Sequence, residues 1–117
     1  MREIKFRGFN KGTKKWYYGF FTRTEYTGDY WIDGRTSGIV EEDSIGQYTG
    51  LKDKNGVEIY EGDLVKFGAL THKVIWNEER ASFGLMFEKK SFSMSDMDRE
   101  KYNVVGNIYE EKLKEEK

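Results

Sequence analysis

The sequence predicts an all-β fold with at most one short helix, and three observations support this prediction. Aromatic residues make up 16% of the 117 residues, and aromatic side chains favour β-strands. The chain has 13 glycines and no proline, so glycine alone separates its apolar runs. Most of these runs are short and alternate apolar and polar residues with a period of two, which is typical of half-buried strands. We expect the strands to be short and strongly twisted.

The N-terminal part predicts a hairpin with an unusually aromatic second strand. Residues 4–9 alternate between the two faces of a strand, and Asn10-Lys11-Gly12 ends it. The run from residue 16 to 21 then places aromatic side chains on both faces of one strand: Trp16, Tyr18 and Phe20 against Tyr17 and Phe21. In a small domain one face of a strand is normally exposed to solvent. We therefore expect Tyr17 and Phe21 to be partly exposed or covered by a second chain.

The central stretch, QYTGLKDKNGVEIYEGDLVKF at residues 47–67, predicts two further turns between strands. Asn55-Gly56 between alternating apolar residues is a strong hairpin signal, and we expect a type I′ turn with Gly56 at positive φ. Glu61-Gly62-Asp63 predicts the second turn.

The second half, from about Asp63 to Tyr109, is predicted to close into a small SH3-like barrel. Ser95 followed by acidic residues predicts a short helix over residues 96–101. Gly106 interrupts the last predicted strand and indicates a bulge. Residues 110–117 are nearly all charged, so we expect them to fray. No linker or repeat divides the chain, and we expect a single domain over residues 1–117.

Composition excludes several functional classes. The 20 basic and 21 acidic residues give a net charge of −1, which argues against bulk attraction to nucleic acid or to an acidic membrane. The absence of cysteine excludes disulfides and thiolate metal sites. No apolar run reaches the roughly 20 residues of a membrane span, and the N-terminus has no apolar segment of a secretory signal. We expect a cytoplasmic protein without membrane contact.

Four blocks of the sequence resemble the YopX family: MREIKFRGF, QYTGLKDKNGVEIYEGDLVKF, VIWNEERASFGL and VVGNIYE. They occur in the family's order and span most of the chain, whereas residues 15–46 match no pattern of the family. The resemblance implies a compact, mostly β protein that is encoded by a phage or prophage and made in the bacterial cytoplasm. It implies no catalytic residues.

The polar residues of the centre favour structural roles over chemistry. An EF-hand alignment of Gly56 puts Leu51 and Gly62 at ligand positions, so Asp53 is not expected in a calcium loop. The carboxylates Glu58, Glu61 and Asp63 could serve a small hydrolase, but we favour solvated turn residues or partners for Arg7. His72 is the only histidine and is predicted to lie on a polar strand face. We expect no enzyme, cofactor or metal.

Basic residues interleaved with aromatics mark the best candidate surface: Lys14, Lys15, Trp16, Tyr17, Phe21 and Arg23. The leading hypothesis is a protein interface or self-association, in which exposed aromatic side chains act as anchors. The alternative is single-stranded nucleic acid, because lysines attract phosphates and aromatic faces stack on bases. An aromatic core with lysines at the loop tips also fits this pattern. For Arg7 we expect an ion pair with a carboxylate.

Overall fold

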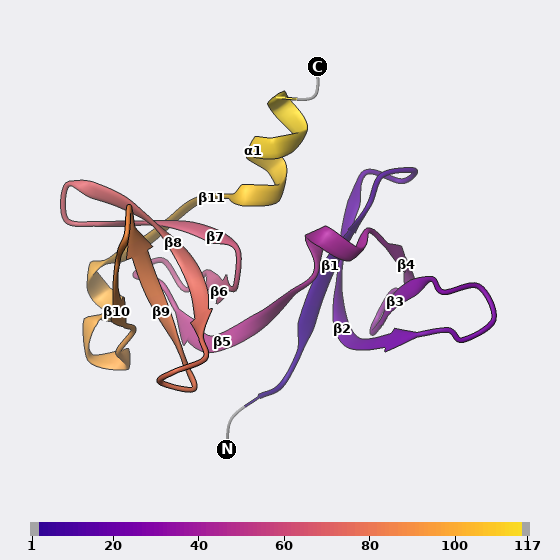
Figure 1. Cartoon of the computed structure of the whole chain (residues 1–117), viewed down its shortest axis with the longest axis horizontal. Helices are drawn as coiled ribbons and strands as arrows, with labels where there is room; N and C mark the ends of the chain where they lie inside the picture. Colours follow the sequence, from indigo (N-terminus) through magenta and orange to yellow (C-terminus); the bar gives the residue numbers. More distant parts are fainter. Residues whose placement is uncertain (1–2, 116–117) are drawn as a thin grey trace. The chain divides into compact units, whose positions relative to one another are not determined.

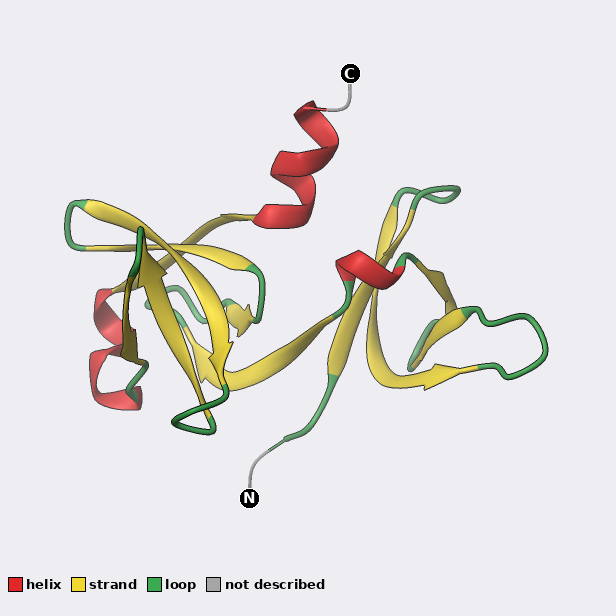
Figure 2. Ribbon diagram, in the orientation of Figure 1, coloured by secondary structure: helices red, strands yellow, loops and turns green. Residues whose placement is uncertain are grey.

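The computed structural model of the protein describes residues 3–115, except for the side chains of residues 96, 97 and 99. The chain divides into two compact units, Met1–Tyr48 and Thr49–Lys117. Antiparallel strands dominate both units (Figures 1 and 2), so the predicted mostly β fold is confirmed. The single domain expected over residues 1–117 stays a prediction.

The described part of the first unit is one curled antiparallel sheet. Its elements in chain order are β1 (Phe6–Asn10), β2 (Lys15–Arg23), β3 (Tyr30–Asp33), β4 (Gly38–Val40), the 3₁₀ helix η1 (Glu42–Ser44) and the start of β5 (Gly46–Lys52). The sheet order in this unit is β4-β3-β2-β1-β5, and β5 runs on through Tyr48 into the second unit. The predicted N-terminal hairpin is therefore β1–β2.

Side chains of β3 and β4 fill the inner face of this sheet. Ile32 is fully buried, and Val40 is buried as well. A Cβ atom added at Gly8 would lie 2.6 Å from Val40 Cγ2, so only glycine allows β4 to approach β1 this closely. Ser44 of η1 stabilises the packing of this segment against β1, because its hydroxyl accepts the Phe9 N–H at 2.8 Å.

The second unit contains a further antiparallel sheet in the order β10-β9-β8-β7-β11. The elements of the second unit that follow β5 are, in chain order, β6 (Glu58–Tyr60), β7 (Asp63–Phe67), β8 (Leu70–Asn77), β9 (Ser82–Phe87), β10 (Lys90–Ser93), the 3₁₀ helix η2 (Asp96–Lys101), β11 (Tyr102–Asn107) and α1 (Ile108–Glu115). Of these, β6 pairs with β5 and not with the five-stranded sheet. Among the described residues, β10 and β11 are opposite edges of this sheet and do not pair. The sheet is therefore not closed, and the predicted SH3-like barrel is not confirmed.

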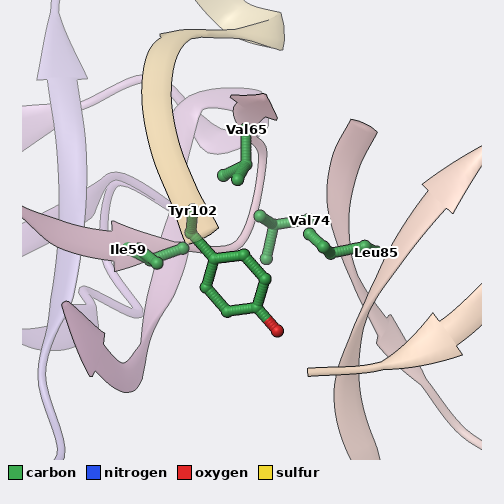
Figure 3. Close-up of a cluster of buried hydrophobic side chains, with 5 residues drawn as sticks. All are labelled: Ile59, Val65, Val74, Leu85 and Tyr102. Carbon is green, nitrogen blue, oxygen red and sulfur yellow. The ribbon is translucent and has the colours of Figure 1, made fainter. Parts of the chain in front are cut away.

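One cluster of buried side chains forms the core of the second unit: Ile59, Val65, Val74, Leu85 and Tyr102. Figure 3 shows the aliphatic side chains gathered around the Tyr102 ring. The Tyr102 hydroxyl accepts the Ser95 N–H at 3.2 Å. Burial raises the pKa of this phenol above its usual value, and nearby Asp98 raises the pKa further, while the hydrogen bond from Ser95 opposes both.

The central hairpin lies between β5 and β6, but its turn is not of type I′. Gly56 has φ 80°, as predicted, whereas Asn55 is not among the residues at positive φ that a type I′ turn needs at both central positions. The Gly56 N–H donates to the Asp53 carbonyl at 3.0 Å, and the Asp53 N–H donates to the Val57 carbonyl at 2.8 Å. The Asp53 side chain, rather than two left-handed residues, shapes this turn.

Gly56→Val is expected to lower the free energy of unfolding by about 1–3 kcal/mol, because a β-branched residue is strained at positive φ. No atom lies within 4 Å of an added Cβ, so the loss measures backbone strain without a clash. Chemical denaturation provides the measurement, with Gly56→Asn as the control, since asparagine tolerates this conformation. Equal stability of the valine variant and the native chain would contradict the assigned turn.

The C-terminal end corrects the expectation that residues 110–117 fray, because residues 110–115 belong to α1 (Ile108–Glu115), while residues 116 and 117 lie outside the described residues. The Asn107 side-chain oxygen accepts the Glu110 N–H at 2.8 Å, and this bond caps the first turn of the helix. Buried Tyr109 anchors the helix. The spacing of Asn107 and Glu110 resembles a capping box and was the available sequence signal. The short helix predicted over residues 96–101 is present as η2, and the bulge predicted at Gly106 is confirmed.

Candidate functional site

The outer face of the sheet in the first unit carries an exposed line of aromatic side chains. Trp16, Tyr18 and Phe20 alternate along β2 and therefore project from one face. Tyr18 is 47% exposed and Phe20 is 69% exposed, whereas Trp16 is half-buried against Phe9, with 5.2 Å between ring centroids. We call these three side chains the outer aromatic row.

Tyr17 and Phe21 lie on the opposite, inner face of β2. Phe21 is directly paired with buried Ile32, and cross-strand partners share a face. Phe21 also stacks on Tyr30 at 5.6 Å between ring centroids. The Tyr17 hydroxyl is 3.2 Å from the hydroxyl of Thr13. Both side chains are partly exposed, as expected, but they also line the core of this unit.

The predicted surface is thus divided between two faces of the sheet. Of the aromatic residues in the six-residue surface, only Trp16 belongs to the outer aromatic row, whose most exposed members are Tyr18 and Phe20. The sequence of the β1–β2 hairpin contained a signal for which face of β2 lies toward the core. Gly8 pairs with Tyr17, and a glycine opposite an aromatic residue indicates that another element packs closely on that face.

The two arginines of this region also serve different faces. The Arg7 guanidinium lies over the Trp16 ring, 4.8 Å from the ring centre, on the outer face. The Arg23 guanidinium lies over Tyr30 at 5.4 Å, on the inner face. The ion pair expected for Arg7 stays a prediction beside this cation–π contact.

The turn of the β1–β2 hairpin presents three exposed lysines, which we call the lysine tip: Lys11, Lys14 and Lys15. Lys14 has φ 58°, and its N–H donates to the Asn10 carbonyl at 2.8 Å. The Asn10 side chain accepts the Thr13 N–H at 2.8 Å and donates to the Ile39 carbonyl at 2.8 Å. These bonds tie the turn to β4, so the lysines project from a well-defined loop.

Asp53 and Asp63 are built into the backbone hydrogen-bond network rather than solvated. Asp53 is only 4% exposed and accepts the N–H groups of Asn55 and Val57 at 2.8 and 2.9 Å. Its second oxygen accepts the Val104 N–H of β11 at 2.9 Å. Asp63 is 1% exposed and accepts the Tyr60 N–H at 2.8 Å, so the expectation of a solvated turn residue is wrong for Asp63.

His72 is buried, and its predicted position on a polar face is wrong. Its ring lies among three phenylalanine rings, at centroid distances of 6.0 Å from Phe67, 5.8 Å from Phe87 and 5.5 Å from Phe92. The register explains this position, because His72 pairs with buried Val65 and shares its face. Alternation along the strand also places His72 on the same face as buried Val74, and this was the available sequence signal.

Within the described residues, no three histidine or acidic side chains gather in an arrangement that could hold a metal ion. None of the described helices has the length and apolar character required to cross a membrane.

Comparisons with known proteins give a family and similar solved structures. A family model described as "YopX protein" matches residues 5–113. The chain is also similar in structure to protein EF1440 from Enterococcus faecalis, with a TM-score of 0.57 and 26% sequence identity. This match covers 96% of the chain and 97% of its neighbour. No curated protein matches the chain.

Proposed function

The chain belongs to the YopX family, and on this premise we propose that it is a non-enzymatic binding module that docks another protein chain on its outer aromatic row. The partner is a different protein or a second copy of this chain. The module is a phage- or prophage-encoded accessory protein, and it acts in the cytoplasm of the bacterial host.

The exposure of Tyr18 and Phe20 carries this proposal. Aromatic side chains are enriched at protein interfaces, where a few buried aromatic anchors supply most of the affinity. Ile39 of β4 is also exposed, and the β3 residue Trp31 lies between it and β2 in the sheet. Trp31 and Ile39 thus add apolar side chains to the same face, beside polar Thr22 and Asp33, and such a mixed surface suits a protein partner.

The central carboxylates support a non-enzymatic role. A general acid or base must reach its substrate with a free oxygen. The Asp53 oxygens instead accept backbone N–H groups, and Asp63 holds the turn before β7 in the same way. Glu58 accepts the Tyr60 hydroxyl at 3.0 Å. In these contacts the carboxylates of Asp53, Asp63 and Glu58 have structural roles.

Matched double variants on the two faces of β2 test the proposal. Tyr18→Ser with Phe20→Ser is expected to keep the fold and to abolish partner capture, because these side chains are exposed anchors. Tyr17→Ser with Phe21→Ser is expected to lower the free energy of unfolding, because these side chains line the core with Ile32. Circular dichroism and thermal unfolding measure the fold of each variant.

Partner capture is measured with the tagged native chain in extract of the bacterial host, followed by direct binding of the identified partner to each purified variant. A folded outer-face variant that binds the partner with unchanged affinity would overturn the proposed docking surface. An unfolded outer-face variant would show that the outer aromatic row belongs to the core, and this result would overturn it as well.

Single-stranded nucleic acid is the second candidate, and the spacing of the outer aromatic row favours it. Rings two residues apart on a strand are separated by about 6.6 Å, which suits successive bases of an extended strand. Arg7 lies on this face, although Asp33, the direct neighbour of Phe20, weakens a phosphate-binding field. Retention of the native chain on single-stranded DNA with steep salt dependence, and its loss in the Tyr18→Ser, Phe20→Ser variant, would favour this candidate.

A further inference from the structure

We propose that the lysine tip of one copy binds the loop between β2 and β3 of a second copy, so that the chain associates head to tail. The inference deepens the proposed function by naming a second copy as a partner, and it rests on that function only in treating the chain as a binding module. The contact uses two loops of the first unit that lie outside the outer aromatic row.

The β2–β3 loop presents an aromatic side chain on an ordered support. Tyr26 is fully exposed at its end. The Thr24 N–H donates to the Asp29 carbonyl at 2.9 Å, and the Gly28 N–H donates to the Thr24 carbonyl at 2.8 Å. The hydroxyls of Thr24 and Thr27 are 2.7 Å apart. An aromatic ring held out by such a loop is pre-organised to contact a partner.

The two loops have complementary chemistry. We call the side chains Glu25, Tyr26 and Asp29 the tyrosine tip, which carries two carboxylates and one aromatic ring. The Arg23 guanidinium also reaches this loop, 3.6 Å from a Cβ built at Gly28, so one cation opposes the two carboxylates and their excess is a single negative charge. The lysine tip carries three ammonium groups and no carboxylate. Lysine ammonium groups bind carboxylates and also lie favourably over tyrosine rings. The ammonium groups of the lysine tip can therefore bind the carboxylates and the ring of the tyrosine tip.

The fold keeps the two tips of one chain apart. The lysine tip ends at Lys15, the first residue of β2, and the tyrosine tip follows the strand, so the length of β2, about 26 Å when extended, separates them. Figure 1 shows the β1–β2 turn at the top of the first unit and the β2–β3 loop at its outer edge. Each tip thus binds only a partner copy, and such a contact between unlike surfaces produces chains or closed rings.

Sedimentation velocity and light scattering on the full native chain test the proposal. We expect the weight-average mass to rise with protein concentration at low ionic strength and to fall when salt is added, because the contact is made by exposed charges. A native chain that stays monomeric over the whole concentration range would overturn the inference.

Charge reversal at each tip gives the decisive comparison. The lysine-tip variant is Lys11→Glu, Lys14→Glu and Lys15→Glu, and the tyrosine-tip variant is Glu25→Lys and Asp29→Lys. In each variant alone both tips carry the same charge, so self-association is expected to weaken by about tenfold or more. In an equimolar mixture each reversed tip meets an oppositely charged tip, and association is expected to return.

The matched control variants keep either the positive charges of the lysine tip or the aromatic ring of Tyr26. Lysine-to-arginine replacements at the lysine tip and Tyr26→Phe are expected to preserve association, whereas Tyr26→Ser is expected to weaken it. All substituted side chains except Asp29 are exposed, and circular dichroism checks that every variant folds. Association that survives in each reversed variant alone, or that does not return in the mixture, would overturn the inference.

The same measurements separate this inference from the proposed docking surface. The Tyr18→Ser, Phe20→Ser variant changes the outer aromatic row without touching either tip, so it is expected to lose partner capture on that row but to keep the salt-dependent association through the tips. Salt-dependent binding of the lysine tip to single-stranded DNA, with no self-association, would assign that tip to nucleic acid and would also overturn the inference.

Discussion

Asp53→Ala is expected to lower the free energy of unfolding of the second unit by roughly 4 kcal/mol or more, because charge-assisted hydrogen bonds contribute about 1.5–3 kcal/mol each. The carboxylate accepts three backbone N–H groups, from Asn55, Val57 and Val104. Its removal leaves these donors without their acceptor at a site that is closed to solvent. The variant loses both the turn of the central hairpin and its attachment to β11.

Chemical denaturation followed by tryptophan fluorescence measures this loss, since Trp76 lies in the second unit. Asp53→Asn is the matched control. Its single carbonyl oxygen can still accept the two N–H groups of the turn but not the Val104 N–H, so we expect a smaller loss of stability. An alanine variant within 1 kcal/mol of the native chain, a limit taken from the worth of one ordinary hydrogen bond, would show that water replaces the carboxylate.

Gly19→Ala is expected to destabilise the first unit by about 3 kcal/mol or more, since overpacking against backbone cannot be relieved by a rotamer change. An added Cβ would lie 2.3 Å from the Asp33 carbonyl oxygen. A Cβ at Gly34 would likewise lie 2.1 Å from the Tyr18 carbonyl oxygen, so β2 and β3 approach each other through paired glycines.

Gly28→Ala in the same unit is the control for Gly19→Ala. Gly28 has φ 75°, and the nearest atom to an added Cβ is the end of the Arg23 side chain at 3.6 Å. The control therefore measures backbone strain of about 1–2 kcal/mol without a clash. Thermal unfolding compares the two variants, and equal losses would show that the strands can separate at Gly19 at little cost.

Local chemistry explains what the sequence could predict. Turn residues and period-two alternation depend on neighbouring residues, so they located the N-terminal hairpin, the positive φ of Gly56 and the bulge at Gly106. The helix over residues 96–101 was likewise signalled by Ser95 and the acidic residues after it.

The faces of β2 could not be assigned in the same way. Its apolar residues occupy both parities, so alternation does not choose which side faces the core. The choice is made by Ile32 and Val40, which reach the inner face from strands that follow later in the chain. Tyr18 and Phe20 are exposed because those contacts cover the opposite side.

A non-local contact decides the burial of Asp53. A carboxylate in a turn is ordinarily solvated, but Asp53 accepts the Val104 N–H of β11, which lies too far along the sequence to appear in a local pattern. The burial of His72 is different, because alternation already places it on the face of Val74 and the adjacent hairpin pairs it with Val65. Only the phenylalanine rings of β9 and β10 around it are more distant in sequence.

The bond from Asp53 to Val104 joins residues that are 51 positions apart, and it has a consequence for synthesis of the chain. During synthesis the central hairpin leaves the ribosome well before β11, so the Asp53 carboxylate stays hydrated until β11 emerges. Tyr102, the centre of the buried cluster, arrives with the same strand. The second unit therefore completes its folding late, whereas the contacts between β1 and β4 in the first unit form from residues made much earlier.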